Sequence, residues 1–175
     1  MLRIILLIVF YMSFSHIALS QVQIDSVFFI IRNLIHSKVH VARTQNLDAA
    51  AKFHAEYLVL HKAIGHLQVD SPSTKTPMRR AEKFGDYGLG VYEVCWSGTM
   101  KYKNLPNTPK DAIMHFKISD KHWDIMTRAM SERDTVRFGY SLTMDKDWAA
   151  CVIIYSTGSQ VKLDSNGFRI NDNKK

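Results

Sequence analysis

The sequence feature that most constrains the fold is a nearly continuous apolar run from Trp148 to Tyr155. Such a run is typical of a central strand, which is buried on both of its faces. The segment from Arg137 to Met144 precedes it with alternating apolar residues, and Asp145-Lys146-Asp147 supplies a short hairpin turn between the two. A further strand is predicted from Tyr87 to Trp96. The chain is therefore expected to build a sheet whose middle strand needs cover on both sides.

Four stretches have apolar residues at helical spacing. We expect the second to begin at Asn46, a favourable N-cap, and to end near Gly65. The third begins with a capping threonine, a proline at the first helical position and an acid in the first turn. Ser119 is expected to cap the fourth. These helices are predicted over Ile24 to Lys38, Asn46 to Gly65, Thr108 to Phe116, and Ser119 to about Met130. This order of elements favours an α+β sandwich over an alternating βαβ array.

The N-terminus has the pattern of a cleavable secretory signal peptide. Arg3 gives a basic start, an apolar run follows, and Ala18 and Ser20 are small residues at the positions that a signal peptidase reads. An uncleaved membrane anchor is the alternative, but the apolar run is shorter than the roughly 20 residues that span a bilayer. We expect no later membrane-spanning segment, and a secreted protein that is extracellular or resides in the periplasm or cell envelope. The predicted parts are a signal peptide at residues 1–20, one domain at 21–160 and a polar tail at 161–175.

The charged residues of the chain are mixed rather than clustered. Its 175 residues include 23 Lys and Arg against 16 Asp and Glu, a formal net charge of +7. Only Lys101-Tyr102-Lys103 and Met78-Arg79-Arg80 are locally dense in basic residues, and such short clusters are typical of a solvated surface. Nucleic acid is therefore not expected as a partner.

The two cysteines, Cys95 and Cys151, both fall in apolar, strand-like runs. In an oxidising compartment they could form a disulfide, but a buried free thiol fits such runs equally well. Two cysteines cannot build a disulfide-dense scaffold. The apolar residues, 46% of the chain, must therefore hold the fold.

The candidate chemical groups are His66, Glu93 and His122, which lie in or beside apolar segments where burial would demand hydrogen-bonding partners. His54 and His61 share one side of the second predicted helix and are interpreted as packing residues. The sequence contains no His-Glu-x-x-His metalloprotease motif and no Gly-x-Ser-x-Gly nucleophile elbow. No reaction class therefore follows from a motif.

Several weak motifs follow one another in a recognisable order. They are Leu47-x-x-Ala50-Ala51-x-x-His54-Ala55-x-Tyr57-Leu58, then His66, Glu93, Phe116-Lys117-Ile118-Ser119-Asp120-Lys121-His122, and Val136-Arg137-Phe138-Gly139-Tyr140. Together they resemble the CAP superfamily: cysteine-rich secretory proteins, antigen 5, pathogenesis-related 1 proteins and bacterial SCP-like proteins. Bacterial members read L-x-x-A-A-x-x-H-A, a histidine, G-E-N, W-x-x-S-x-x-H and V-G-x-G. The likeness covers about residues 24 to 157, with phenylalanine at the family's tryptophan and Tyr92 and Val94 flanking the glutamate.

The resemblance implies an α-β-α sandwich with a central, mostly antiparallel sheet flanked by helices. It also implies a cleft in which His66 and His122 face one another with Glu93 beside them. Two imidazoles with open positions would hold Zn²⁺ or another divalent cation weakly. Glu93 would orient a histidine or accept a proton from a bound water. The alternative is a purely structural polar cluster that ties helix to sheet.

The function that this resemblance implies is a secreted, non-enzymatic binding module for a lipid, sterol-like or peptide ligand. The alternative is a metal-assisted hydrolase, such as a protease, in which His66 and His122 hold the metal and Glu93 is the base. Ser119 is a candidate nucleophile by type, but its position favours the role of helix cap. A third alternative is a structural role at the cell envelope.

Overall fold

The computed structural model describes residues 40–101, 108–131 and 135–158. The predicted signal peptide, the predicted helix from Ile24 to Lys38 and the predicted tail at 161–175 lie outside these residues. All of the described residues fall within the domain predicted at 21–160.

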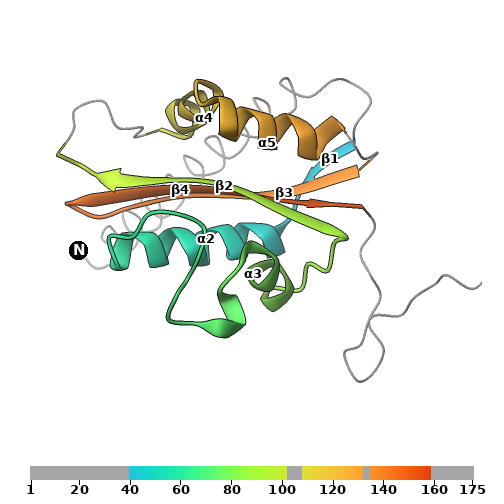
Figure 1. Cartoon of the computed structure of the whole chain (residues 1–175), viewed down its shortest axis with the longest axis horizontal. Helices are drawn as coiled ribbons and strands as arrows, with labels where there is room; N and C mark the ends of the chain where they lie inside the picture. The colour runs from blue at the N-terminus through green and yellow to red at the C-terminus, as the bar shows by residue number, and fades with distance from the viewer. Residues whose placement is uncertain (1–39, 102–107, 132–134, 159–175) are drawn as a thin grey trace, which may run out of the picture.

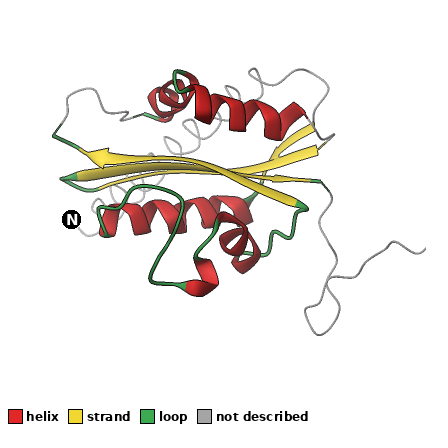
Figure 2. Cartoon of the chain, in the orientation of Figure 1, coloured by secondary structure: helices red, strands yellow, loops and turns green. Residues whose placement is uncertain are grey.

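The described residues form three layers, with one sheet between two pairs of helices (Figure 1). Helices α2 and α3 cover one face of the sheet, and α4 and α5 cover the other (Figure 2). The strands are β1 (His40–Arg43), β2 (Gly90–Thr99), β3 (Thr135–Met144) and β4 (Trp148–Thr157). The helices are α2 (Gln45–Leu60), the short 3-10 helix η1 (Pro72–Thr74), α3 (Pro77–Lys83), α4 (Pro109–Lys117) and α5 (Asp120–Ser131). This is the predicted α+β class and α-β-α sandwich.

The sheet has the strand order β1-β3-β4-β2. Strand β4 pairs antiparallel with both β2 and β3, and the short β1 pairs parallel with β3. The sheet is therefore mostly antiparallel, as expected. Every side chain from Ala149 to Tyr155 is fully buried, which confirms the prediction of a central strand.

The two faces of β4 belong to two separate apolar cores. One core lies under α4 and α5 and includes Phe116, Phe138 and Cys151. The other lies under α2 and α3 and includes Leu58 and Cys95. The two cysteines thus sit on neighbouring strands but on opposite faces of the sheet, where a disulfide would need backbone movement. Both are free and buried in this structure, an arrangement that favours the buried thiol of the two alternatives.

Helix α2 lies directly against β3. This close approach is possible because residue 139 is glycine. A Cβ atom at that position would overlap the backbone of Leu47 and Asp48. The Asp48 carboxylate accepts hydrogen bonds from the Tyr140 backbone amide (3.0 Å) and from Arg43 Nε (2.8 Å). These contacts fix the beginning of α2 on the middle of the sheet.

The capping residues of the helices agree only in part with those predicted from the sequence. The expected N-cap at Asn46 is wrong because Thr44 caps α2, with its side chain accepting from the Leu47 amide at 3.3 Å. The helix also ends at Leu60 rather than near Gly65, and Lys62 adopts a positive φ just beyond it. The predicted start of α4 is confirmed, because the Thr108 hydroxyl accepts from the Asp111 amide at 3.2 Å.

Three elements were not predicted: β1, η1 and α3. The interpretation of Met78-Arg79-Arg80 as a solvated basic cluster is wrong for Arg80, whose side chain is fully buried. Arg80 lies on the side of α3 that faces β2, where it pairs with Glu93. Its neighbour Arg79 lies on a different side of the helix and is exposed. A buried guanidinium needs a carboxylate partner, and the candidate site supplies one.

Candidate functional site

The candidate site is built around Glu93, a buried carboxylate on the α2 side of β2. Its Oε2 accepts from Arg80 Nη2 at 2.6 Å, and its Oε1 accepts from His66 Nδ1 at 3.0 Å. Burial alone would raise the pKa of Glu93, but the hydrogen bond from His66 and the charge of Arg80 outweigh it and hold the pKa below its ordinary value. Glu93 is therefore an ionised carboxylate that acts as a hydrogen-bond acceptor on both oxygens.

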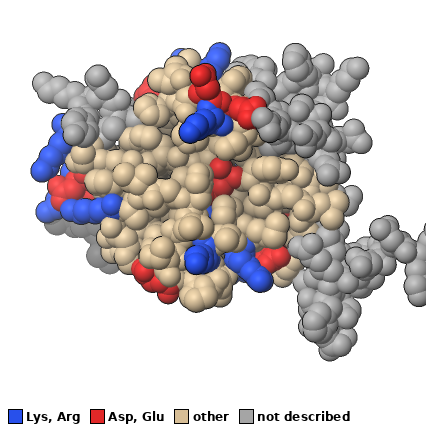
Figure 3. Space-filling model, in the orientation of Figure 1, with Lys and Arg blue, Asp and Glu red and all other residues tan. Residues whose placement is uncertain are grey.

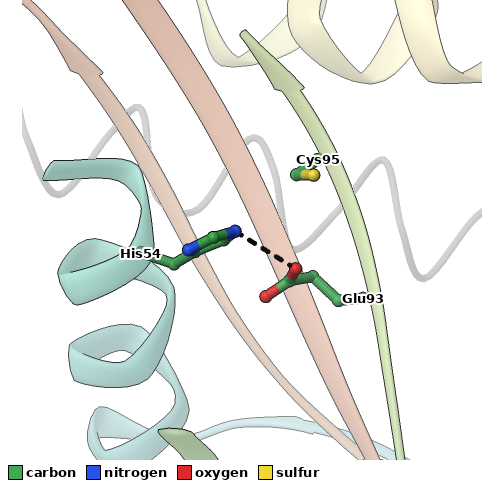
Figure 4. Close-up of side chains that lie close together, drawn as sticks. All are labelled: His54, Glu93 and Cys95. Atoms are coloured by element: carbon green, nitrogen blue, oxygen red, sulfur yellow. Dashed lines mark ion pairs between the residues drawn. The ribbon is translucent and has the colours of Figure 1, made fainter. Parts of the chain in front are cut away.

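His54 reaches the same carboxylate from α2, and Figure 4 shows its ring pointing towards Glu93 on β2. Its Nε2 lies 3.5 Å from Glu93 Oε1 and 3.0 Å from the carbonyl oxygen of Gly65, and its Nδ1 lies 3.2 Å from Gln68 Nε2. Burial lowers the pKa of His54 to about 4, although the charge of Glu93 acts in the opposite direction. The ring is therefore neutral at pH 7, donating to Gly65 and accepting from Gln68.

Cys95 completes the buried group from the same strand as Glu93. Its Sγ donates to the Gly65 carbonyl at 3.4 Å and lies 3.4 Å from His66 Nδ1. Burial raises the pKa of the thiol, and the charge of Glu93 raises it further. Cys95 is therefore a protonated thiol at pH 7 and not an activated nucleophile.

His54, Glu93 and Cys95 could hold a metal ion by distance, because one ligand atom from each lies within 4.8 Å of the others. Their chemistry fits a metal poorly. Arg80 already neutralises the carboxylate, both ring nitrogens of His54 have hydrogen-bonding partners, and the thiol carries its proton. The group is satisfied as a hydrogen-bonded network without an ion.

His66 and His122, the predicted metal ligands, approach from different layers. His66 lies in the loop after α2, where its side chain is 43% exposed and its Nδ1 is bound to Glu93. His122 lies in the first turn of α5, with its Nδ1 2.9 Å from Ser119 Oγ and its ring edge-to-face with Phe116. Burial lowers the pKa of His122, and the charges of His66 and His115 lower it further, so the histidines lie within electrostatic reach.

The structure thus brings His66 and Glu93 into contact, whereas His122 makes no hydrogen bond with either of them among the described side chains. Of the two histidines interpreted as packing residues, His61 stacks on Tyr57 at the surface beside Asp70. His54 is buried as a packing residue would be, but it is also part of the polar network, which the helical spacing alone did not reveal.

Sequence reasoning missed Arg80. A signal was present, because Thr76 followed by Pro77 is an N-cap and first-position pair of the kind used to predict α4. Helical spacing from Pro77 would have placed Arg79 and Arg80 on different sides of a helix. It would not have identified Glu93 as the partner.

Comparisons with known proteins identify the fold. No family model and no curated protein matches the sequence. An outer surface protein from Borrelia burgdorferi has 16% identity and a TM-score of 0.54, over 77% of this chain and 94% of that one. An extracellular protein containing an SCP domain from Bacillus anthracis has 17% identity and a TM-score of 0.50, over 71% of this chain. This chain spans 36% of the Bacillus protein. The domain therefore has an SCP-like fold of the CAP type, as the resemblance of the motifs predicted.

Proposed function

We propose that this chain is a secreted, non-enzymatic binding domain whose His66 and His122 hold a divalent cation such as Zn²⁺ weakly, beside a site for a lipid or peptide ligand. The observation that carries the proposal is that each imidazole has its Nδ1 engaged by a polar neighbour, Glu93 for His66 and Ser119 for His122. A hydrogen bond of this kind fixes the ring and leaves Nε2 for a ligand.

The protonation states support a metal as that ligand. Glu93 accepts from His66 Nδ1, so in the neutral ring the proton lies on Nδ1 and Nε2 is the nitrogen left for a metal. The lowered pKa of His122 keeps this second imidazole neutral at pH 7, and a neutral imidazole is the form that binds Zn²⁺. Two protein ligands leave the remaining coordination positions to water or to the bound molecule, so we expect weak binding.

The state of Glu93 argues against the hydrolase alternative. A general base must reach a water molecule and have a pKa near the working pH. Glu93 is only 5% exposed, both of its oxygens already accept hydrogen bonds, and its pKa is lowered. Its role in the proposed site is therefore to orient His66.

The surface around His66 supports an apolar or mixed ligand. Ile64 and Leu67 flank this histidine in the same loop and are 79% and 49% exposed. The face drawn in Figure 3 shows an acidic group near its centre and further charged side chains towards its left end and its upper and lower rims, with uncharged residues, polar as well as apolar, between them. An exposed apolar surface of this kind is a common feature of binding sites.

A location outside the cytoplasm is supported by the predicted signal peptide and by the two proteins of similar fold, described as an outer surface protein and an extracellular protein. Among residues 40–101, 108–131 and 135–158, no helix combines the length and the apolar character needed to cross a membrane.

The test is a calorimetric titration of the purified chain with Zn²⁺, in wild type and in His66→Ala and His122→Ala. We expect micromolar or weaker binding in the wild type and its loss in both variants. His61→Ala is the matched control, since His61 is an exposed histidine of the neighbouring loop. Equal affinity in all four proteins would refute the metal site.

The ligand is tested separately by extracting the protein purified from culture medium and analysing the extract by mass spectrometry. Co-purifying lipid or peptide that is reduced in Ile64→Ser and Leu67→Ser supports the binding role. A protein that carries neither, and that takes up no lipid from vesicles of neutral and anionic phospholipids, would contradict it.

A further inference from the structure

We infer that Arg80 is the positioning residue of this site: it holds both the backbone and the ring of His66, so that the imidazole is kept in one orientation and one tautomer. This inference rests on the proposed function only for its purpose, which is the binding of a metal ion by His66. The hydrogen bonds that join Arg80, Glu93 and His66 do not depend on that function. It concerns a residue that touches no ligand and acts through His66.

Two hydrogen-bonded paths run from Arg80 to His66. The direct path joins Arg80 Nη2 to the carbonyl oxygen of His66 at 3.1 Å. The second path joins the same Nη2 to Glu93 Oε2 at 2.6 Å, and Glu93 Oε1 to His66 Nδ1 at 3.0 Å. One guanidinium nitrogen therefore fixes where the residue lies and, through the carboxylate, how its ring is turned.

Arg80 is itself held in place by the loop that follows His66. Its Nη1 donates to the carbonyl oxygens of Thr74 (3.1 Å) and Lys75 (3.3 Å). The planar guanidinium can make these contacts and the Glu93 contact together, whereas a lysine ammonium is a single point of charge and cannot span them. The side chain thus ties the loop, the sheet and α3 to one another.

Stability does not account for this arrangement. The ion pair of Arg80 and Glu93 is fully buried, and such pairs often contribute little net stability because both charges lose their hydration. In addition, Arg80 Nε is buried without a hydrogen-bonding partner in the described structure, which costs further free energy. Both hydrogen bonds of Nη2 lead to His66, one directly to its carbonyl oxygen and one through Glu93, while those of Nη1 go to Thr74 and Lys75.

The consequence is a single tautomer of His66. While Glu93 is held by Arg80 as an acceptor, the ring presents Nδ1–H to it, so the neutral ring takes the tautomer whose lone pair is on Nε2. Without the guanidinium, the carboxylate and the His66 carbonyl lose their common donor, so the ring is free to turn and to exchange tautomers. Zn²⁺ would then bind a smaller fraction of molecules.

The experiment combines the tautomer of His66 with Zn²⁺ affinity in wild type, Arg80→Met and Arg80→Lys. Long-range ¹H–¹⁵N correlation spectra report which ring nitrogen carries the proton, without any metal present. We expect one Nδ1–H tautomer in wild type, a mixture in Arg80→Met with about tenfold or greater loss of Zn²⁺ affinity, and an intermediate result in Arg80→Lys. Arg79→Met is the matched control, because Arg79 is an exposed arginine of the same helix.

The outcomes separate the two proposals. If Arg80→Met is folded, as judged by its amide spectrum, and keeps the wild-type tautomer of His66, the positioning role is refuted. If the tautomer changes but wild type binds no Zn²⁺, the positioning role stands and the proposed metal function fails. If Arg80→Met does not fold, Arg80→Lys decides: an unchanged tautomer there refutes the role, and a mixed one supports it.

Discussion

Replacing His54 by glutamine should make the domain less sensitive to mild acid. The His54 ring is fully buried and neutral, with its two nitrogens bound to Gly65 and Gln68. Its pKa is about 4 in the folded state because burial disfavours the charged ring, against an ordinary value of 6.5. As the pH falls below 6.5, the unfolded chain binds a proton at this position that the folded domain does not bind until about pH 4. Folding stability is therefore lost across this interval as the solution becomes more acidic.

The size of the effect follows from the two pKa values. Each pKa unit corresponds to about 1.4 kcal/mol, so the histidine removes about 2 kcal/mol of unfolding free energy between pH 7 and pH 5. That is a large fraction of the 5–15 kcal/mol typical of a domain. This interval also lies above the ordinary pKa values of Glu93 and Asp86, 4.5 and 3.8, whose lowered pKa values make stability fall only in stronger acid.

The assay is urea unfolding, followed by tryptophan fluorescence, of wild type and His54→Gln at several pH values from 7 to 5. Glutamine will lower stability at pH 7, since it cannot fill the space of the ring, but its unfolding free energy should fall about 2 kcal/mol less than that of wild type over the interval. His61→Gln, at an exposed histidine, is the control for the substitution itself. Parallel slopes in wild type and His54→Gln would refute the assignment of a neutral buried ring.

Two further results are expected from the packing of the domain. Neither Cys95 nor Cys151 should react with a thiol reagent in the folded protein, and both should react in urea without prior reduction, as counted by absorbance and mass spectrometry. A disulfide between them in the purified protein would contradict their placement on opposite faces. Gly139→Ala should destabilise the domain by about 3 kcal/mol or more, because the new Cβ meets the Leu47 backbone. Gly98→Ala, where the new Cβ makes only an ordinary contact, is its control in the same urea unfolding assay, and equal stabilities would refute the close approach of α2 and β3.

The parts of the fold that could be predicted from the sequence are those with strong local periodicity. The apolar run of β4 and the cap of α4 each identify an element without reference to the rest of the chain. Strand β1 could not be found in this way, because its four residues pair with β3 nearly a hundred positions later. The ends of α2 were misplaced because both Asn46 and Thr44 are good caps, and only the tertiary path of the chain selects between them.

The candidate site was accessible to sequence reasoning only through the family resemblance. The order of motifs pointed to His66 and Glu93, which the structure places 3.0 Å apart. The partners that determine the state of Glu93 were not accessible, because a buried arginine and an exposed one look alike in a sequence. Arg80 differs from Arg79 only in the side of a short helix on which it falls.

The position of β4 has a consequence for how the protein is made. It lies between β2 and β3 and is the last described strand along the chain, so among the described strands β2 has no neighbour until synthesis of β4 begins at Trp148. Such late, long-range pairing delays closure of the sheet. Until β4 has been made, the residues of β2 and β3 that it joins have no hydrogen-bonding partner between them, so the two apolar cores that β4 separates cannot close.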